Sequence, residues 1–142
     1  MATKLKYRYQ KGTNAERELI EMFWNNGYAA LRGPGSGVSR RPCPDVVAGN
    51  GEKYFAIESK SSTQDYVHLT YDEIVKLVTF AQTFGAIPYV AVRFEGRDWV
   101  FLDIGKIQYT KGKNFKVSKK FAYTDGKRFE ELIELQEEKK LE

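Results

Sequence analysis

The sequence is poor in the residues that build thiol and imidazole sites, with one cysteine, Cys43, and one histidine, His68, in 142 residues. A single cysteine excludes an intrachain disulfide and a cysteine-based zinc site, and a single histidine excludes a histidine-rich metal site. Any bound metal would therefore have oxygen ligands, which are the ligands that Mg²⁺ and Mn²⁺ prefer.

Long apolar runs are also scarce. No segment is long enough to cross a bilayer, and the basic residues near the N-terminus are not followed by the apolar stretch of a signal peptide. We therefore expect a soluble intracellular protein.

The sequence does contain enough apolar residues for a core. Hydrophobic residues make up 42% of the chain and aromatics 14%, which suits one packed domain of this length. The charge is uneven, because residues 1–128 hold 21 basic and 13 acidic side chains, a net charge of +8, whereas the whole chain carries +4. Such a basic body favours a polyanionic partner.

The pattern of apolar residues, caps and turns predicts the order αβββαββ followed by a C-terminal tail helix. Thr13 and Glu16 form a capping-box pattern for a helix to about residue 26, and a second helix opens at residues 70–73 and stops at Gly85. The predicted strands cover 28–32, 45–49, 54–60, 87–94 and 99–104, with Asn50-Gly51 as a hairpin turn. Residues 33–44 and His68 are placed in loops, and 106–120 are irregular or an edge strand.

This order indicates a mixed α/β fold, in which a central mixed β-sheet is flanked by helices. We expect one domain over 1–142, with a basic arm over 1–12, a core over about 13–120 and a charged tail over about 122–142. No internal repeat or interdomain linker interrupts it.

Pro44-Asp45 and Glu58-Ser59-Lys60 are the residues with the clearest chemical pattern. Glu58 and Lys60 are two residues apart on a strand and so share one face, while Phe55, Ile57 and Ser59 take the core-facing side. The hairpin can bring Asp45 close to Glu58, and two neighbouring carboxylates repel each other unless a cation lies between them. The pattern therefore predicts a divalent-metal site, with Lys60 orienting water or stabilising charge on a phosphate.

Each of these residues also has an ordinary explanation. Asp45 alone could cap a turn, and Glu58 with Lys60 could be a simple same-face pair. Their combination on a predicted hairpin, after Pro44 and in a basic chain, favours the functional interpretation. Glu16 has two compatible roles, as the capping partner of Thr13 or as a third, outer-sphere carboxylate of the metal site.

The loop after Arg32 carries Ser36, Ser39, Arg40 and Arg41 among glycines. Glycines permit close approach of the backbone to phosphates, although a plain flexible connector has the same composition. Arg93 and the basic residues between 106 and 120 are individually weak signals that together could follow a phosphate backbone.

Together these residues resemble the archaeal Holliday-junction resolvases of the Hjc/Hje type, within the PD-(D/E)xK nuclease superfamily. The resemblance covers about residues 10–120 and rests on several motifs: Lys11-Gly12, Ala15-Glu16-Arg17-Glu18-Leu19, Arg32 before a Gly/Ser loop, Pro44-Asp45-Val46-Val47-Ala48-Gly49-Asn50-Gly51, Ile57-Glu58-Ser59-Lys60, Phe84-Gly85, Ile87-Pro88 and Ala91-Val92-Arg93-Phe94.

The resemblance implies a restriction-endonuclease-like core and a single nuclease domain. It also implies a Mg²⁺-dependent endonuclease (Mn²⁺ substituting) that works as a homodimer, cuts four-way DNA junctions by paired nicks, and is cytoplasmic and nucleoid-associated. Glu16, Asp45 and Glu58 would match the acidic metal-site positions, Lys60 the catalytic lysine and Ser36 the loop serine, with Ser39 as the alternative. Arg17 and Arg32 would match basic positions near the scissile phosphate. With the other basic and loop residues, the predicted DNA-binding set is Lys11, Arg17, Arg32, Ser39, Arg40, Arg41 and Arg93.

Two other functions stay open at this point. One is another nuclease of the same superfamily, of restriction or repair type, that acts on linear duplex DNA. The second is a DNA-binding module that has lost hydrolysis, which the presence of Glu16, Asp45, Glu58 and Lys60 disfavours.

Overall fold

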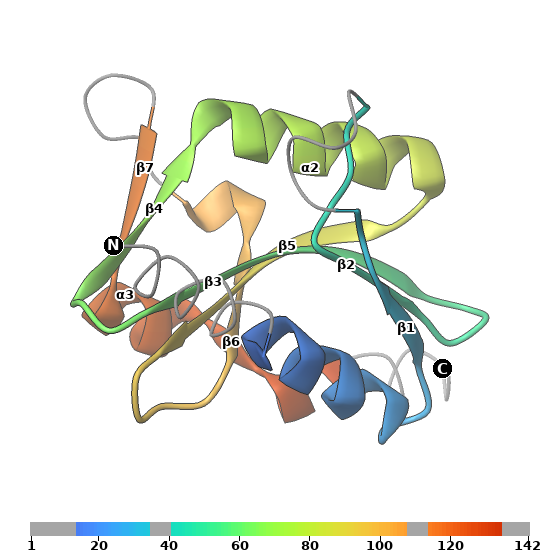
Figure 1. Cartoon of the computed structure of the whole chain (residues 1–142), viewed down its shortest axis with the longest axis horizontal. Helices are drawn as coiled ribbons and strands as arrows, with labels where there is room; N and C mark the ends of the chain where they lie inside the picture. The colour runs from blue at the N-terminus through green and yellow to red at the C-terminus, as the bar shows by residue number, and fades with distance from the viewer. Residues whose placement is uncertain (1–13, 35–40, 108–113, 135–142) are drawn as a thin grey trace, which may run out of the picture.

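A six-stranded mixed sheet forms the centre of the computed structural model, which describes residues 14–34, 41–107 and 114–134 (Figure 1). β3 and β5 are parallel and the other neighbours are antiparallel. The predicted central mixed sheet is thus confirmed. In spatial order its strands are β1 (Ala29–Arg32), β2 (Val46–Gly49), β3 (Tyr54–Ser62), β5 (Ile87–Phe94), β6 (Val100–Asp103) and β8 (Lys127–Arg128).

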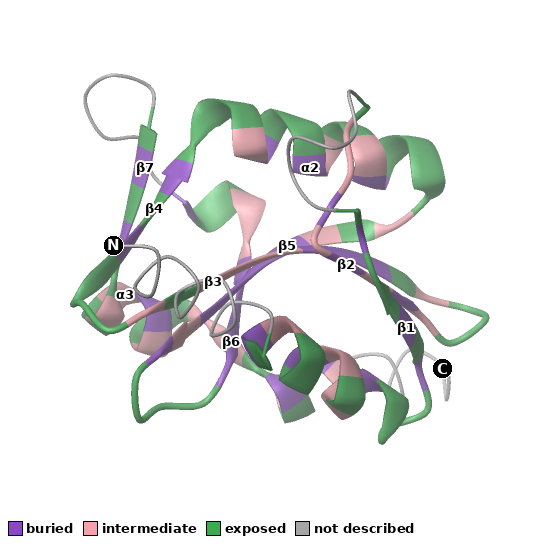
Figure 2. Ribbon diagram, in the orientation of Figure 1, coloured by how far each residue is buried: buried purple, intermediate pink, exposed green. Residues whose placement is uncertain are grey.

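Helices cover both faces of this sheet. In Figure 1, α2 (Tyr71–Phe84) lies above it and the N-terminal helix, residues 14–24, lies below it. Figure 2 shows buried residues on the sides of these helices that face the sheet. β3 is therefore buried on both faces: Phe55 and Ile57 join the core under the N-terminal helix, as expected, and Ala56 joins a second core under α2.

The ends of α2 follow the signals in its sequence. Thr70 is the N-cap, and its side chain forms a reciprocal capping box with Glu73. The helix ends at Gly85, whose φ of 89° is the left-handed conformation that glycine adopts at little cost. The predicted start and stop of this helix are both confirmed.

The central elements keep the predicted order, but the structure adds a separate two-stranded sheet of β4 (Tyr66–Thr70) and β7 (Asn114–Ser118). The prediction of a loop at His68 was wrong, since this exposed residue lies in β4 opposite Lys116. Alternation explains the pairing, because the side chains between the exposed positions are buried: Val67, Leu69, Phe115 and Val117.

The C-terminal part is more integrated than a charged tail suggests. After η1 (Ile104–Lys106) and β7 the chain forms α3 (Lys119–Asp125), then β8, and a helix whose described part is 129–134. The predicted tail helix therefore starts later than residue 126, because residues 127 and 128 pair with β6. Phe129 and Leu132 are buried in the core that contains Phe23 and Phe101. Among the described helices, none is long and apolar enough to cross a membrane.

Candidate active site

β2 and β3 separate at the point where the acidic residues lie. β2 begins at Val46, which pairs with Ile57, whereas β3 continues alongside β5 as far as Ser62. Pro44 has no N–H and cannot extend the β2 ladder, so the chain leaves the sheet immediately before Asp45. Residues 58–62 of β3 therefore have no β2 partner, and the next position of the register sets Asp45 opposite Glu58.

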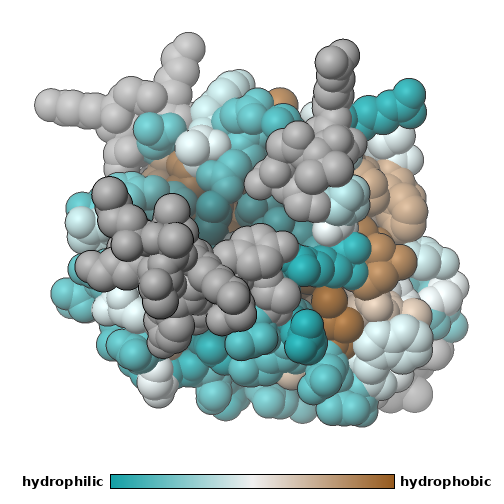
Figure 3. Space-filling view, in the orientation of Figure 1, coloured by the Kyte–Doolittle hydropathy of each residue, from teal (hydrophilic) through white to brown (hydrophobic). Residues whose placement is uncertain are grey.

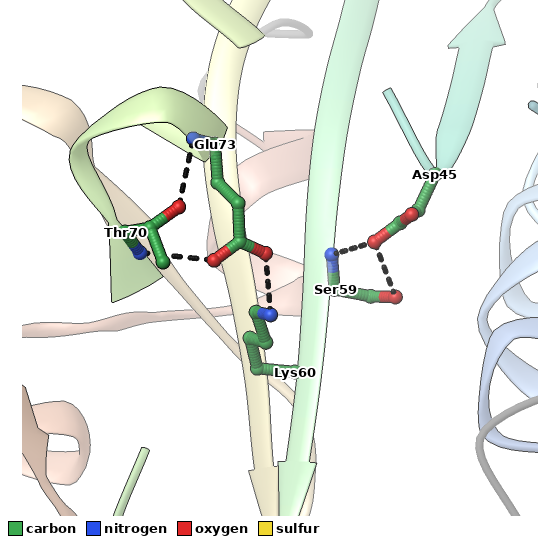
Figure 4. Close-up of polar contacts among 5 residues, drawn as sticks. All are labelled: Asp45, Ser59, Lys60, Thr70 and Glu73. Carbon is green, nitrogen blue, oxygen red and sulfur yellow. Dashed lines mark hydrogen bonds and ion pairs between the residues drawn. The ribbon is translucent and has the colours of Figure 1, made fainter. Parts of the chain in front are cut away.

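The Asp45 side chain occupies part of the space that β2 leaves beside β3 (Figure 4). Its Oδ2 accepts hydrogen bonds from the Ser59 backbone N–H at 2.9 Å and from the Ser59 hydroxyl at 3.3 Å. Its backbone carbonyl accepts a bond from Gly33 N at 2.7 Å. A Cβ on Gly33 would lie 1.9 Å from the Pro44 carbonyl oxygen, so this close approach of the chain requires glycine.

Glu58 has the most strongly perturbed acidity of the site. Burial, the neighbouring Asp45 charge and a hydrogen bond to Asp45 raise the pKa of Glu58 to about 9. Lys60 opposes this shift and Glu73 adds to it, both through their charge. Asp45 and Glu58 thus form a close carboxylate pair that needs a proton or a cation between its members.

Glu16 approaches the same pair from the N-terminal helix. Arg32 Nε lies 2.6 Å from its Oε2, in an ion pair that is not an aligned hydrogen bond. Burial and the Asp45 charge raise the pKa of Glu16, and Arg32 only partly offsets them. Glu16 therefore lies close enough to Asp45 for their charges to interact, while Arg32 is its direct partner. Its suggested capping partner, Thr13, lies outside the described residues.

Lys60 points to the α2 side of β3 (Figure 4). Its Nζ lies 2.5 Å from Glu73 Oε2, and both side chains are about three-quarters buried, with exposed fractions of 29% and 28%. Sequence reasoning missed this role of Glu73, because the Thr70 capping box already accounted for its carboxylate. A lysine that projects from a half-buried strand needs an acidic partner, which is the signal that could have indicated one.

A hard divalent cation fits the donors that the chain offers here. In the ranges that the structure describes, no group of three or more His, Cys, Asp or Glu side chains could hold a metal ion. Mg²⁺ does not require such a group, because proteins commonly bind it through one or two carboxylates together with waters and substrate phosphates. The close Asp45 and Glu58 carboxylates match that pattern, and positive charge between them would relieve their repulsion.

The predicted DNA-binding residues are placed differently from one another. Arg17 is exposed on the N-terminal helix, and Arg41 is exposed just before the site. Arg93 is partly exposed; it pairs with Glu18 at 2.6 Å, and its guanidinium lies over the Trp99 ring. Four predicted residues lie outside the described ranges: Lys11, Ser36, Ser39 and Arg40.

Comparison with known proteins gives one consistent family. The family model of archaeal Holliday junction resolvases (Hjc) matches residues 7–141, further toward the C-terminus than the sequence motifs suggested. The crossover junction endodeoxyribonuclease Hjc of Archaeoglobus fulgidus is 48% identical over 107 residues, which are 75% of this chain and 78% of the relative. The protein of that name from Methanocaldococcus jannaschii is 31% identical over 117 residues, 82% of each chain.

Among solved structures, Archaeoglobus fulgidus Hjc, a Holliday junction resolvase from an archaeal hyperthermophile, superimposes with a TM-score of 0.78 at 42% identity. The match covers 84% of this chain and 98% of that chain. The similarity therefore covers most of this chain and nearly all of the relative's chain.

Proposed function

Since the chain belongs to the family of archaeal Holliday junction resolvases (Hjc), we propose that it is a crossover junction endodeoxyribonuclease, which resolves four-way DNA junctions by metal-dependent hydrolysis of phosphodiester bonds. The observation that carries the proposal is the close Asp45–Glu58 pair beside Lys60, at the point where β2 and β3 separate. The two carboxylates and the Lys60 ammonium are adjacent, as hydrolysis of a phosphodiester requires.

We assign the roles at this site as follows. Asp45 and Glu58 would hold Mg²⁺, with Mn²⁺ as a substitute, and Glu16 would accept hydrogen bonds from water beside them. When bound, such an ion supplies positive charge for the phosphate and lowers the pKa of water. Lys60 would donate a hydrogen bond to the attacked phosphate or to the attacking water. Arg17, Arg32 and Arg41, with Lys11, Arg40, Arg93 and the loop residues Ser36 and Ser39, would contact the DNA backbone.

The Asp45→Asn variant tests this assignment. We expect it to bind an immobile four-way junction like the parent but to lose Mg²⁺-dependent cleavage, since the neutral amide lacks the negative charge that holds the cation. Single-turnover cleavage and gel-shift binding on the same junction measure the two properties. Cleavage at the parental rate would refute the site, and equal cleavage of a linear duplex of the same length would refute junction selectivity.

We further propose that the enzyme acts as a homodimer through an aromatic surface at the end of α2. Phe84 is 53% exposed, stacks on Phe80 and contacts the edge of Tyr54. In Figure 3, hydrophobic residues gather at the right of the molecule, which is the side on which α2 ends in Figure 1. Large apolar side chains that remain exposed together are typical of a surface that another protein covers.

Phe84→Glu tests the homodimer, with Val75→Glu as its control. Val75 is 41% exposed on the same helix, and its nine-residue separation from Phe84 is about two and a half turns, which puts it on the opposite flank. We expect Phe84→Glu to weaken the dimer about thirtyfold and Val75→Glu to leave it intact, as measured by light scattering across a dilution series. A dimer unaffected by Phe84→Glu would exclude this surface.

A further inference from the structure

The Lys60 ammonium lies near two carboxylates, and its contacts distinguish between them. Glu58 is on the same strand face and feels the Lys60 charge. The hydrogen bond that the structure gives to Lys60 goes instead to Glu73, at 2.5 Å. The lysine thus reaches across to α2 and leaves the Glu58 carboxylate to Asp45.

Glu73 is itself held in place from the other side. Its Oε1 accepts a hydrogen bond from the Thr70 backbone N–H at 2.9 Å, and its own N–H donates to the Thr70 hydroxyl at 3.1 Å. Each carboxylate oxygen therefore serves one partner: Oε1 caps the helix and Oε2 binds Lys60 (Figure 4). The first turn of α2 is anchored in turn by Ile74 and Leu77, which are buried in the second core.

A lysine side chain has a flexible four-carbon stem, so a fixed partner is needed to hold its ammonium in one place. An ammonium two residues from Glu58 would otherwise pair with that carboxylate by simple proximity. Such a pair would occupy an oxygen that the cation needs, and it would draw the ammonium away from the phosphate.

We propose that Glu73 is a positioning residue of the active site, which holds the Lys60 ammonium on the α2 side of β3 and so keeps Glu58 available for the metal. This inference rests on the proposed function, because it takes Lys60 and Glu58 as members of the nuclease site. It adds one residue from outside the Asp45…Glu58-x-Lys60 motif, contributed by the helix that follows β4.

Glu73→Gln separates this role from the role of Glu73 in the helix cap. Glutamine also completes a capping box, because its amide oxygen can accept from the Thr70 N–H. The amide NH₂ then faces Lys60 and cannot accept a hydrogen bond from an ammonium. Two variants serve as controls. Thr70→Ala removes a hydrogen bond of the helix cap but keeps the Glu73 carboxylate. Asp72→Asn neutralises another carboxylate of the same turn, which pairs with Lys76 and not with Lys60.

We expect Glu73→Gln to lower the saturating single-turnover cleavage rate and the affinity for Mg²⁺ each by about ten- to hundredfold, the range found for residues that orient metal-site groups. The Mg²⁺ affinity is measured by titration calorimetry on the DNA-free protein, independently of cleavage. Junction binding and the Tm should change no more than in the controls. Thr70→Ala and Asp72→Asn should keep both the rate and the metal affinity within about twofold of the parent.

Parental rate and metal affinity in Glu73→Gln would overturn the inference, as would equal losses in Thr70→Ala, which would indicate a purely structural role. Asp45→Asn, assayed in the same series, separates this failure from failure of the proposed function. If Asp45→Asn is inactive while Glu73→Gln is parental, only the role of Glu73 is refuted. If Asp45→Asn cuts normally, the site itself is wrong.

Discussion

One ion pair between a carboxylate and a basic side chain lies on each face of the central sheet, near the point where β2 and β3 separate. On the face of the N-terminal helix the pair is Glu16 with Arg32, at 2.6 Å, and on the α2 face it is Glu73 with Lys60, at 2.5 Å. The distances are nearly equal, but the carboxylates are held differently. Glu73 receives aligned hydrogen bonds from Lys60 and Thr70, whereas Glu16 Oε2 is buried against Arg32 without an aligned bond.

The pKa values of the two carboxylates shift in opposite directions, in line with their hydrogen bonds. Burial raises the pKa of Glu73, but the hydrogen bonds from Lys60 and Thr70 outweigh it and lower the pKa overall. Burial and the Asp45 charge raise the pKa of Glu16 despite Arg32. Glu73 is therefore a fixed acceptor with both oxygens hydrogen-bonded, whereas Glu16 Oε2 keeps capacity for another donor such as a water molecule. The α2 face therefore fixes the site, and the face of the N-terminal helix can respond to what the site binds.

Glu58→Gln should have the largest effect on stability, since Glu58 and Asp45 form the close carboxylate pair at the centre of the site. Its folded pKa of about 9 lies above the unfolded value of 4.5, so the folded state binds the extra proton between these limits. The unfolding free energy of the metal-free parent should therefore fall as the pH rises from 4.5 to 9. Glutamine removes this loss, so the stability of the variant relative to the parent should increase by about 3 kcal/mol between pH 6 and pH 8.

Guanidinium unfolding at pH 6 and pH 8, with a chelator present, measures this difference. Ser59→Ala is a suitable control, because it removes a bond to Asp45 without changing the charge of the pair. Parent and Glu58→Gln stabilities that vary in parallel with pH would show that the pair carries no such strain.

Gly33→Ala should disturb the Glu16–Arg32 pair on the face of the N-terminal helix and leave the Glu73–Lys60 pair on the α2 face intact. Its Cβ would meet the Pro44 carbonyl at 1.9 Å and push the chain between Arg32 and Asp45 out of place. We expect a loss of about 1–3 kcal/mol of unfolding free energy, together with slower junction cleavage. Gly105→Ala is the matched control, because a Cβ there meets nothing within 4 Å and the backbone is not left-handed. Equal stability of the two variants would mean that the loop can move away without cost.

The pair at the centre of the site could be predicted from the sequence because its geometry is local. The Asn50-Gly51 turn sets the hairpin register, and that register puts Val46 against Ile57 and hence Asp45 next to Glu58. Alternation along β3 then assigns Lys60 to the Glu58 face. Each step uses residues close together in the chain, where turn chemistry and the two-residue period act directly.

The surrounding elements could not be predicted in this way because they depend on distant partners. His68 lies in β4, which pairs with β7 much further along the chain. Alternation of buried and exposed residues favours a strand in each segment, but no local signal identifies the partner strand. Glu73 presented the opposite difficulty, since the local capping box accounted for its carboxylate and hid the contact with Lys60. Buried Phe129 likewise belongs to the core only through tertiary packing.

The smallest expected effects are the stability changes of Glu73→Gln and Glu16→Gln, which should have opposite signs at pH 7. The lowered pKa of Glu73 contributes stability that is present above the unfolded pKa of 4.5 and is lost as the pH falls through the folded value. Glu73→Gln should thus be less stable than the parent at pH 7, and the gap should close in acid. Glu16 has a raised pKa, so Glu16→Gln should be at least as stable as the parent at pH 7, with a gap that also closes in acid.

Both differences should stay below about 1 kcal/mol, because solvent screens these partly exposed pairs. Chemical unfolding of the metal-free proteins at pH 7 and pH 4 measures them, with Asp72→Asn as a control for the loss of an exposed carboxylate in the α2 turn. Differences of the same sign at pH 7 would mean that Glu16 is as well satisfied by Arg32 as Glu73 is by Lys60. The N-terminal helix would then supply a second fixed anchor, and the capacity to accept a new donor would have to belong to Asp45 and Glu58 alone.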